Sequence, residues 1–355
     1  MNAYLFLENG RRFAGSAFGF EGEAIGTLSF NTSAISSMEL LSDPVSAGAI
    51  VLQTFPMAGN YGVIREDLRG GKVCCAGYVC REWCEEPSNF RCGGTLDELL
   101  KEFKVPGICG IDTRELTRVL RESGSMNAMI TAKASLSADE LKALKAYKPA
   151  CPAEKVGVRE VSFTGKDEGA KSIGVLDFGA GDICEKELFE RGFGVYLIPY
   201  DYSLTDMAAL DLDGLVVSDG PGSAADYPEA KKNLQALFGE MPIFGVGLGH
   251  EVLAEALGGK CEAMTHEHRG ANQPVREIAT GRVRITTQNH GSAVAKLPQG
   301  GEVTFVSEHD GSVEGIEYKD KNAFSVQFTP LTDGGVNDQA YIWDNFAAMV
   351  SGGDR

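Results

Sequence analysis

The sequence has few of the residues that metal and redox chemistry require. Only five histidines occur among its 355 residues, and none of them lies in the first half of the chain. Five of the nine cysteines fall between positions 74 and 92, but none of these pairs has the C-x-x-C spacing of a zinc or dithiol site. We therefore expect buried or incidental thiols, with no metal and no cofactor.

Positive charge and long apolar runs are also scarce. The chain carries 33 basic and 50 acidic residues, a net charge of −17, which argues against sequence-independent binding to nucleic acid. No apolar run approaches the length needed to cross a bilayer, and the first eight residues lack the basic segment of a signal peptide. We expect a cytoplasmic globular protein that contacts neither nucleic acid nor membrane.

Residues 1–147 are interpreted as one α+β domain. Short apolar segments separated by glycine turns, such as Tyr4–Leu7 and Ala49–Gln53, predict strands. A helix should begin at Asp112, which has capping-box spacing to Glu115, and end at Gly124. This part of the chain shows no catalytic constellation.

Two further regions follow. Residues 148–171 mix proline, glycine and charge without apolar periodicity, so we expect a linker there. In residues 172–355, apolar runs alternate with helical patterns, which predicts a mostly parallel central sheet flanked by helices. The expected fold class is therefore α/β for this domain, and ligands should bind at the carboxyl ends of its strands.

One such strand end has the pattern of a nucleophile elbow without a nucleophile. The segment Pro242–Glu251 predicts a buried strand, a tight turn and a helix, and the turn residue is Gly247. In an elbow the reactive side chain sits on a strained bend where backbone N–H groups can receive an oxyanion. Glycine tolerates the bend but has no side chain that could attack a substrate.

Several motifs occur together with this segment and indicate a family. In the second half, their order resembles that of class I glutamine amidotransferase domains. In the first half, they resemble the domain found in the small chain of carbamoyl phosphate synthase. The motifs are Ser218–Gly222, Pro242–His250, Gln288–Gly291 and Phe324–Gln327 for the former, and Phe30–Ser33, Asp43–Pro44, Gly59–Asn60, Ser88–Phe90 and Gly110–Thr117 for the latter.

The resemblance implies a glutaminase with a Cys-His-Glu triad that passes ammonia to a large, ATP-using chain. The chemistry needs a thiolate, a base and a carboxylate that orients the base. At the corresponding positions this chain has Gly247, Thr329 and Leu331, and Pro330 keeps the register between the last two. No catalytic residue is therefore expected at the triad positions.

The implied glutamine pocket is altered as well. Val45, Glu251 and Ser292 stand where the family has a serine, a glutamine and an aromatic residue. The family residues that remain are Gly220, Gly222, Leu248, Asn289 and Gly291. We expect these eight positions to be a remnant of the substrate site in which the backbone cradle persists.

Other residues do not offer an evident replacement triad. His250 and His290 occur where the active family also has histidine, so we interpret them as structural support for the helix and the loop. Asp219 and Glu251 are acidic residues that would project toward the same crevice, Glu251 one helical turn beyond Gly247. A pocket that prefers a cation such as ammonium is one hypothesis for this pair, and charges exposed at the rim of the crevice are the more common arrangement.

Three functional hypotheses follow. The first is a small-chain homologue that has lost glutamine hydrolysis and serves as a structural or regulatory subunit for an ammonia-using large chain in pyrimidine or arginine synthesis. The second is a stand-alone binding or regulatory protein that reuses the amidotransferase fold. The third, an enzyme with relocated catalytic groups, is the least favoured because no nucleophile, base and orienter occupy plausible positions.

Overall fold

The computed structural model describes residues 1–34, 37–148, 153–165, 169–330 and 339–352. The chain forms two compact units. Unit 1 comprises Met1–Pro152 with Thr265–Gly270, and unit 2 comprises Ala153–Met264 with Ala271–Arg355. Each unit has its own buried apolar core, as the sequence predicts for a chain of this length.

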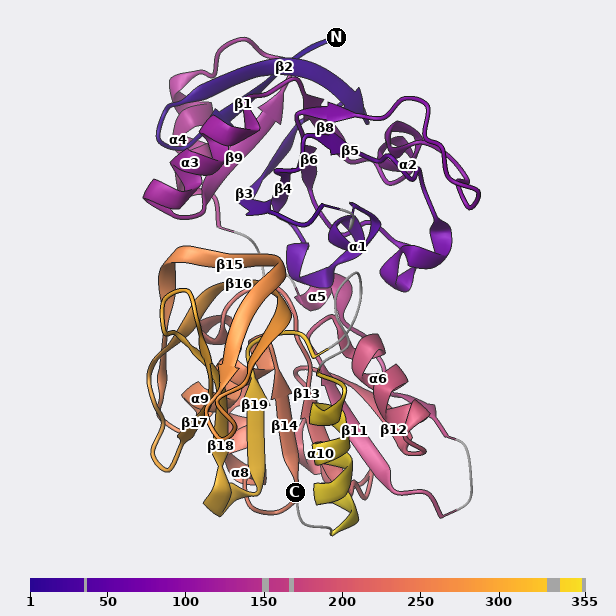
Figure 1. The fold of residues 1–355 in the computed structure, drawn as a ribbon, viewed down its shortest axis with the longest axis vertical. Coiled ribbons are helices and arrows are strands. Elements are labelled where there is room, and N and C mark those ends of the chain that lie inside the picture. The colour runs from indigo at the N-terminus through magenta and orange to yellow at the C-terminus, as the bar shows by residue number, and fades with distance from the viewer. Residues whose placement is uncertain (35–36, 149–152, 166–168, 331–338, 353–355) are drawn as a thin grey trace. The chain divides into compact units, whose positions relative to one another are not determined.

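Unit 1 is built around a closed barrel whose strands follow the order β1-β2-β8-β6-β4-β3-β9 (Figure 1). The pairs β3–β4, β4–β6 and β6–β8 are parallel, and the other pairs are antiparallel. Closure leaves no unpaired edge in the barrel. The barrel strands are β1 (Asn2–Leu7), β2 (Arg12–Gly19), β3 (Ala24–Asn31), β4 (Ile50–Gln53), β6 (Gly77–Val79), β8 (Pro106–Cys109) and β9 (Met126–Thr131). Strands β5 (Met57–Ala58) and β7 (Glu82–Trp83) form a separate two-stranded sheet.

The helix predicted from Asp112 is α3 (Thr113–Ser123), and its apolar face packs into the barrel core through Leu116, Val119 and Leu120. The Asp112 side chain accepts a hydrogen bond from the Glu115 N–H, as the cap spacing predicts. The other helices of unit 1 are α1 (Ser37–Ser42), α2 (Leu96–Glu102) and α4 (Ala138–Ala146), with short 3-10 helices η1 (Pro44–Ser46), η2 (Arg65–Asp67) and η3 (Arg69–Gly71).

Unit 2 contains a ten-stranded sheet in the order β10-β12-β11-β13-β14-β19-β18-β17-β15-β16. Strands β12, β11, β13, β14 and β19 are mutually parallel. The pairs β10–β12, β19–β18, β18–β17 and β17–β15 are antiparallel. The strands are β10 (Ser162–Thr164), β11 (Ser172–Asp177), β12 (Gly194–Pro199), β13 (Gly214–Val217), β14 (Ile243–Val246), β15 (Lys260–Glu277), β16 (Val283–Lys296), β17 (Glu302–Ser307), β18 (Val313–Tyr318) and β19 (Ala323–Val326).

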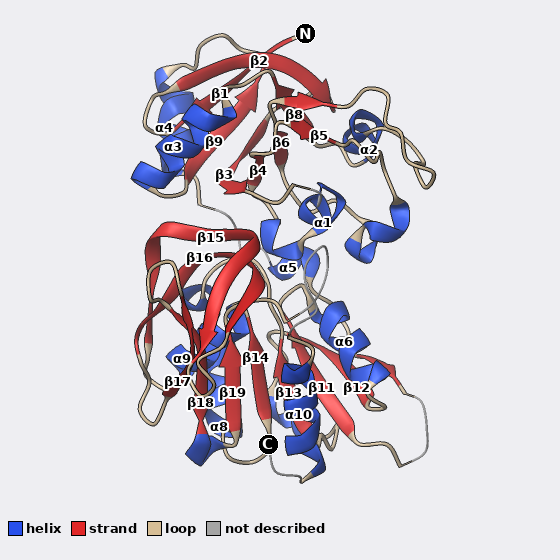
Figure 2. Cartoon of the chain, in the orientation of Figure 1, coloured by secondary structure: helices blue, strands red, loops and turns tan. Residues whose placement is uncertain are grey.

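Helices pack against this sheet (Figure 2), so its central strands are buried throughout, as expected for parallel strands. Phe244 on β14 stacks on Phe324 and meets Trp343 edge-on, with ring centroids 4.5 and 5.0 Å apart. The predicted α/β architecture is therefore confirmed. The helices are α5 (Ala153–Val156), α6 (Gly181–Glu190), α7 (Leu204–Ala208), α8 (Pro228–Leu237), α9 (Leu248–Ala256) and α10 (Tyr341–Ser351), with η4 (Ala224–Asp226) and η5 (Lys319–Lys321).

The segment expected to be a linker contains secondary structure. Helix α5 and strand β10 both lie within 148–171, and β10 pairs with β12, where Phe163 contacts Tyr196. A three-residue strand is too short to show periodicity, so the sequence does not reveal it.

Among the described residues, no helix combines the length and the hydropathy that a membrane span requires.

Asp177, at the carboxyl end of β11, organises the turn that follows this strand. Its carboxylate is buried and accepts hydrogen bonds from the N–H groups of Gly179, Gly181 and Val158 at 2.7–2.8 Å. Hydrogen bonds to a buried charged group are stronger than average, and losing the acceptor leaves three donors unpaired. The turn thereby supports the neighbouring loop, because the Ala180 N–H donates to the Asp219 carbonyl.

We predict that Asp177→Ala lowers the free energy of unfolding by about 2–4 kcal/mol. Urea unfolding followed by circular dichroism measures the change. Asp201→Ala serves as the control, because Asp201 is exposed and follows the neighbouring strand β12. Equal stability of the two variants would show that the buried carboxylate does not hold the turn.

Candidate functional site

The strand, turn and helix predicted at Gly247 are present. Strand β14 ends at Val246, Gly247 adopts φ +56° and ψ −116°, and α9 begins at Leu248. A positive φ is strained for any residue with a side chain, so glycine adopts this turn at least cost. The Gly247 N–H donates to the carbonyl of Val326 on β19, which fixes the turn to the sheet.

The carboxylate of Asp219 stands at this elbow. Asp219 follows strand β13, and its Oδ1 accepts hydrogen bonds from the N–H of Leu248, at 2.9 Å, and of Gly220, at 2.8 Å. The Leu248 N–H is the amide that follows the elbow residue, the position of an oxyanion-hole donor in a working enzyme. In this chain that donor is engaged by an internal carboxylate.

The backbone of the loop that carries Asp219 is closely constrained by its neighbours. A side chain at Gly220 would collide with the Phe178 carbonyl, so only glycine fits there. Gly222 has φ +94°, and the Tyr227 hydroxyl donates to the Pro221 carbonyl at 2.6 Å. These contacts hold the loop against the turn after β11.

Glu251 is buried in the structure, which makes the expectation of an exposed rim charge wrong for this residue. Its side chain is 3% exposed. Oε1 accepts hydrogen bonds from the Ser292 hydroxyl, at 2.7 Å, and from the Gln327 amide, at 3.2 Å. Ser292 and Glu251 are both expected to belong to the substrate-site remnant, and the structure brings the two together.

The surroundings of Glu251 favour its neutral form. Burial raises the pKa of Glu251 to about 7, against the opposing hydrogen bonds from Ser292 and Gln327. Oε1 of Gln327 is buried and has no hydrogen-bond partner. A protonated Glu251 carries an O–H donor, which an ionised carboxylate lacks.

His250 is bound into the scaffold, as the sequence analysis expects. It is fully buried in α9, and its Nδ1 lies 2.8 Å from the Ser325 hydroxyl. Burial lowers the pKa of His250 to about 3, so the ring is neutral and a poor proton acceptor at physiological pH.

His290 on β16 also makes structural contacts. Its Nδ1 lies 2.8 Å from the Ser292 carbonyl oxygen, and its Nε2 lies 3.2 Å from Gln288 Oε1. The imidazole of His290 is thus part of a polar network within unit 2.

The remaining predicted positions are divided between the two units. Thr329 is partly buried, and its N–H donates to the Thr287 carbonyl as an isolated bridge beside β16. Leu331 lies outside the described residues. Val45 is in η1 of unit 1, where its N–H donates to the Asp43 carboxylate. Asn289 and Gly291 lie on β16, and Leu248 is buried at the start of α9.

Two features of the site could not be read from the motifs. Gln327 appears in the sequence only as part of a strand motif, yet it binds Glu251 across 76 residues of chain. The contact between Asp219 and the elbow joins the ends of two adjacent strands. The order of parallel strands in a sheet is the signal that could have placed Asp219 beside Gly247, because neighbouring strands end at the same edge.

The thiols nearest the elbow in sequence are not activated. Burial raises the pKa of the Cys184 thiol well above its ordinary value, and burial also raises that of Cys261. A thiol that keeps its proton is a poor nucleophile. Neither Cys184 nor Cys261 is therefore an activated nucleophile.

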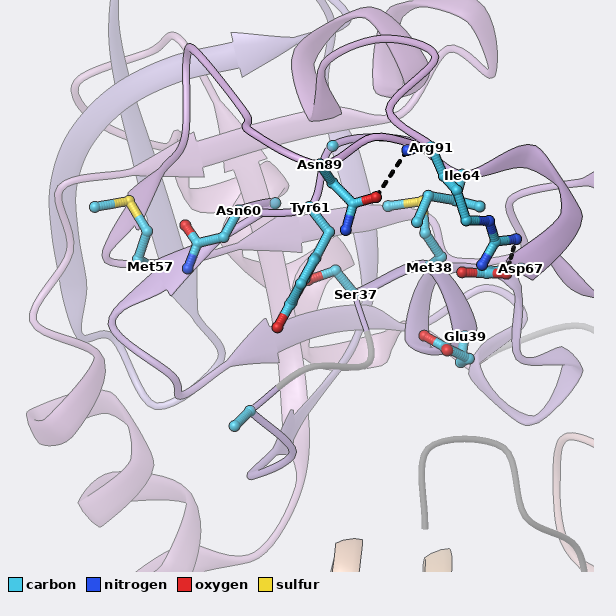
Figure 3. A pocket seen from close by; sticks show the side chains of 13 residues that line it. Ser37, Met38, Glu39, Met57, Asn60, Tyr61, Ile64, Asp67, Asn89 and Arg91 are labelled. Atoms are coloured by element: carbon cyan, nitrogen blue, oxygen red, sulfur yellow. Dashed lines mark hydrogen bonds and ion pairs between the residues drawn. The ribbon is translucent and has the colours of Figure 1, made fainter.

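Unit 1 contains a cavity of about 240 Å³ lined by Met57, Asn60, Tyr61 and Arg91, among others (Figure 3). The Arg91 guanidinium is paired with Asp67 at 2.9 Å, and the Arg91 N–H donates to the Asn89 side chain. Two of the charged groups that line this cavity, Arg91 and Asp67, are thus paired with each other. None of the described lining residues forms a nucleophile with an adjacent base.

We predict that Glu251→Gln stabilises the protein at high pH but not at low pH. The unfolded chain releases the Glu251 proton near pH 4.5, and the folded chain releases it near pH 7. Between these values the folded state binds more protons, so the wild-type free energy of unfolding falls as pH rises and reaches its full loss above pH 7. The variant should be more stable by up to about 3 kcal/mol at pH 8 and equal to wild type near pH 4.5.

Chemical denaturation at several pH values measures this difference. Glu240→Gln is the matched control, because Glu240 is exposed in the turn after α8 and should show no pH-dependent gain. A constant difference between Glu251→Gln and wild type across this pH range would contradict a buried, proton-binding carboxyl.

Comparisons with known proteins agree with the two-part reading of the chain. Residues 5–130 match the family model of the carbamoyl-phosphate synthase small chain, CPSase domain, and residues 175–349 match that of glutamine amidotransferase class-I. The carbamoyl phosphate synthase small chain of Clostridium perfringens is 40% identical over 98% of this chain and 99% of its own length. That of Listeria monocytogenes is 39% identical, over 98% and 96%. The pyrimidine-specific small chain of Bacillus subtilis is 37% identical, over 99% and 96%. The chain therefore belongs to the carbamoyl phosphate synthase small-chain family.

Proposed function

We propose that this protein is a small chain of carbamoyl phosphate synthase that does not hydrolyse glutamine. It would serve as a structural or regulatory subunit of a large, ATP-using chain that takes free ammonia. The observation that carries the proposal is the elbow, where glycine replaces the nucleophile and an aspartate carboxylate occupies the neighbouring amide.

The described residues of unit 2 do not include the thiolate and the base that glutamine hydrolysis requires at the elbow. Attack on the amide carbon needs a thiolate, and Gly247 supplies no side chain. Proton transfer needs a base, and Thr329 has no group with a suitable pKa. His250 is neutral, fully buried and bound to Ser325. Loss of a triad member alone costs several orders of magnitude in rate.

The pocket contacts are altered in a way that also disfavours glutamine. The α-amino acid substrate needs a polar, partly open site, whereas Glu251 is sealed by Ser292 and Gln327. These groups satisfy one another inside the protein. Substrate entry would have to break hydrogen bonds that a buried carboxyl cannot replace with water.

The relatives support the choice of partner. They are carbamoyl phosphate synthase small chains matched over nearly their whole length, and one is pyrimidine-specific. Unit 1 has a closed barrel and a buried core, although its described residues form no catalytic constellation. A retained scaffold without chemistry fits a protein whose task is to bind another subunit, in the pyrimidine or arginine pathway.

The proposal is tested by co-expressing this chain with the large chain encoded in the same genome and purifying through a tag on the large chain. We expect a stoichiometric complex that makes carbamoyl phosphate from ammonium, bicarbonate and ATP, but not when glutamine is the only nitrogen source. The large chain alone is the control for the contribution of this subunit.

Two results would overturn the proposal. Release of glutamate from glutamine by the purified complex would show that the chain hydrolyses glutamine. Failure of this chain to associate with the large chain would instead favour a stand-alone protein that has reused the fold.

A further inference from the structure

The structure gives Asp219 a specific place relative to Gly247. A Cβ atom at residue 247 would come closer than 3.0 Å to the carboxylate carbon and to both carboxylate oxygens of Asp219. Real side chains do not approach so closely, so one of the two groups would have to move. The space a nucleophile would occupy is therefore filled by the end of the Asp219 side chain.

The carboxylate is also held in this place. Oδ1 accepts two backbone hydrogen bonds, from Gly220 and Leu248. Leu248 is the first residue of α9, a helix of nine residues whose N-terminal N–H groups favour negative charge. Both the fit and the charge thus keep Asp219 at the elbow.

We propose that Asp219 is an internal ligand of the elbow that replaces both the nucleophile and the oxyanion, so that residues 219 and 247 are mutually exclusive occupants of one site. A cysteine at 247 and the carboxylate of Asp219 in its present position cannot be accommodated together, so one of them has to move. The elbow without Asp219 is a latent thiol site, because its strand, turn, helix N-terminus and free amide all persist.

The inference concerns the same elbow as the proposed function, but it requires neither a large chain nor glutamine. It is tested with four proteins: wild type, Gly247→Cys, Asp219→Ala and the double variant. Alanine at 219 removes all three atoms that overlap the added Cβ. The backbone strain of a side chain at φ +56° is present in both cysteine variants and cancels in their comparison.

The first readout is thermal stability. Gly247→Cys should lower the melting temperature by several degrees, because the new side chain overlaps a held carboxylate. Adding Asp219→Ala should recover at least half of that loss. As a matched control, Asp201→Ala in the Gly247→Cys background should recover nothing, because Asp201 is exposed after β12.

The second readout is the reactivity of the introduced thiol toward iodoacetamide. The thiol first loses its proton to solvent, and the thiolate sulfur then forms a bond to the probe carbon as iodide leaves. A thiolate at a helix N-terminus is stabilised, whereas a neighbouring carboxylate disfavours it, so the double variant should react at least about tenfold faster than Gly247→Cys at pH 7. Its rate should rise with an apparent pKa below that of a free cysteine.

The chain suits this measurement, because residues 233–260 form a tryptic peptide without a native cysteine. Mass spectrometry of that peptide reports only residue 247. If Gly247→Cys does not fold, Gly247→Ala with and without Asp219→Ala gives the stability comparison.

The proposal is overturned if Asp219→Ala neither stabilises the side-chain variants at 247 nor speeds alkylation. That result would leave the proposed loss of glutamine hydrolysis standing, because the triad positions would still be empty. Conversely, glutaminase activity in the wild-type complex would refute the proposed function without changing the coupling measured here.

Discussion

The hydrogen bond from the Leu248 N–H to the Asp219 carboxylate joins the two loops on which the site depends. One loop follows β13 and the other follows β14, and these strands are neighbours in the parallel sheet. In a glutamine-hydrolysing member, the same amide would serve a transient oxyanion. Here the Asp219 side chain accepts the hydrogen bond from this amide, so the contact is part of the folded structure itself.

The departures from the family pattern are paired in space. The carboxylate of Asp219 fills the volume that Gly247 leaves empty, and Ser292 donates to Glu251. Each pair is a contact inside the protein between residues that lie far apart in the sequence.

Much of the fold follows from local patterns in the sequence. Buried apolar runs separated by helices predict the parallel strands, and cap spacing places α3 to within a residue. Closure of the barrel in unit 1 could not be predicted, because strand order there depends on pairings between distant segments. The same limit hides β10, whose three residues are stabilised by pairing with β12 and by a contact between Phe163 and Tyr196.

For the site, the sequence by itself determined which chemical groups are present. It has glycine at position 247 and threonine at position 329, and no fold can add a thiol or an imidazole to those residues. Only the tertiary structure decided what surrounds them. A carboxylate can be an exposed charge, a buried acid or an acceptor for backbone amides, depending on its neighbours from other elements of the fold. The neighbours of Asp219 and Glu251 come together only when the sheet forms.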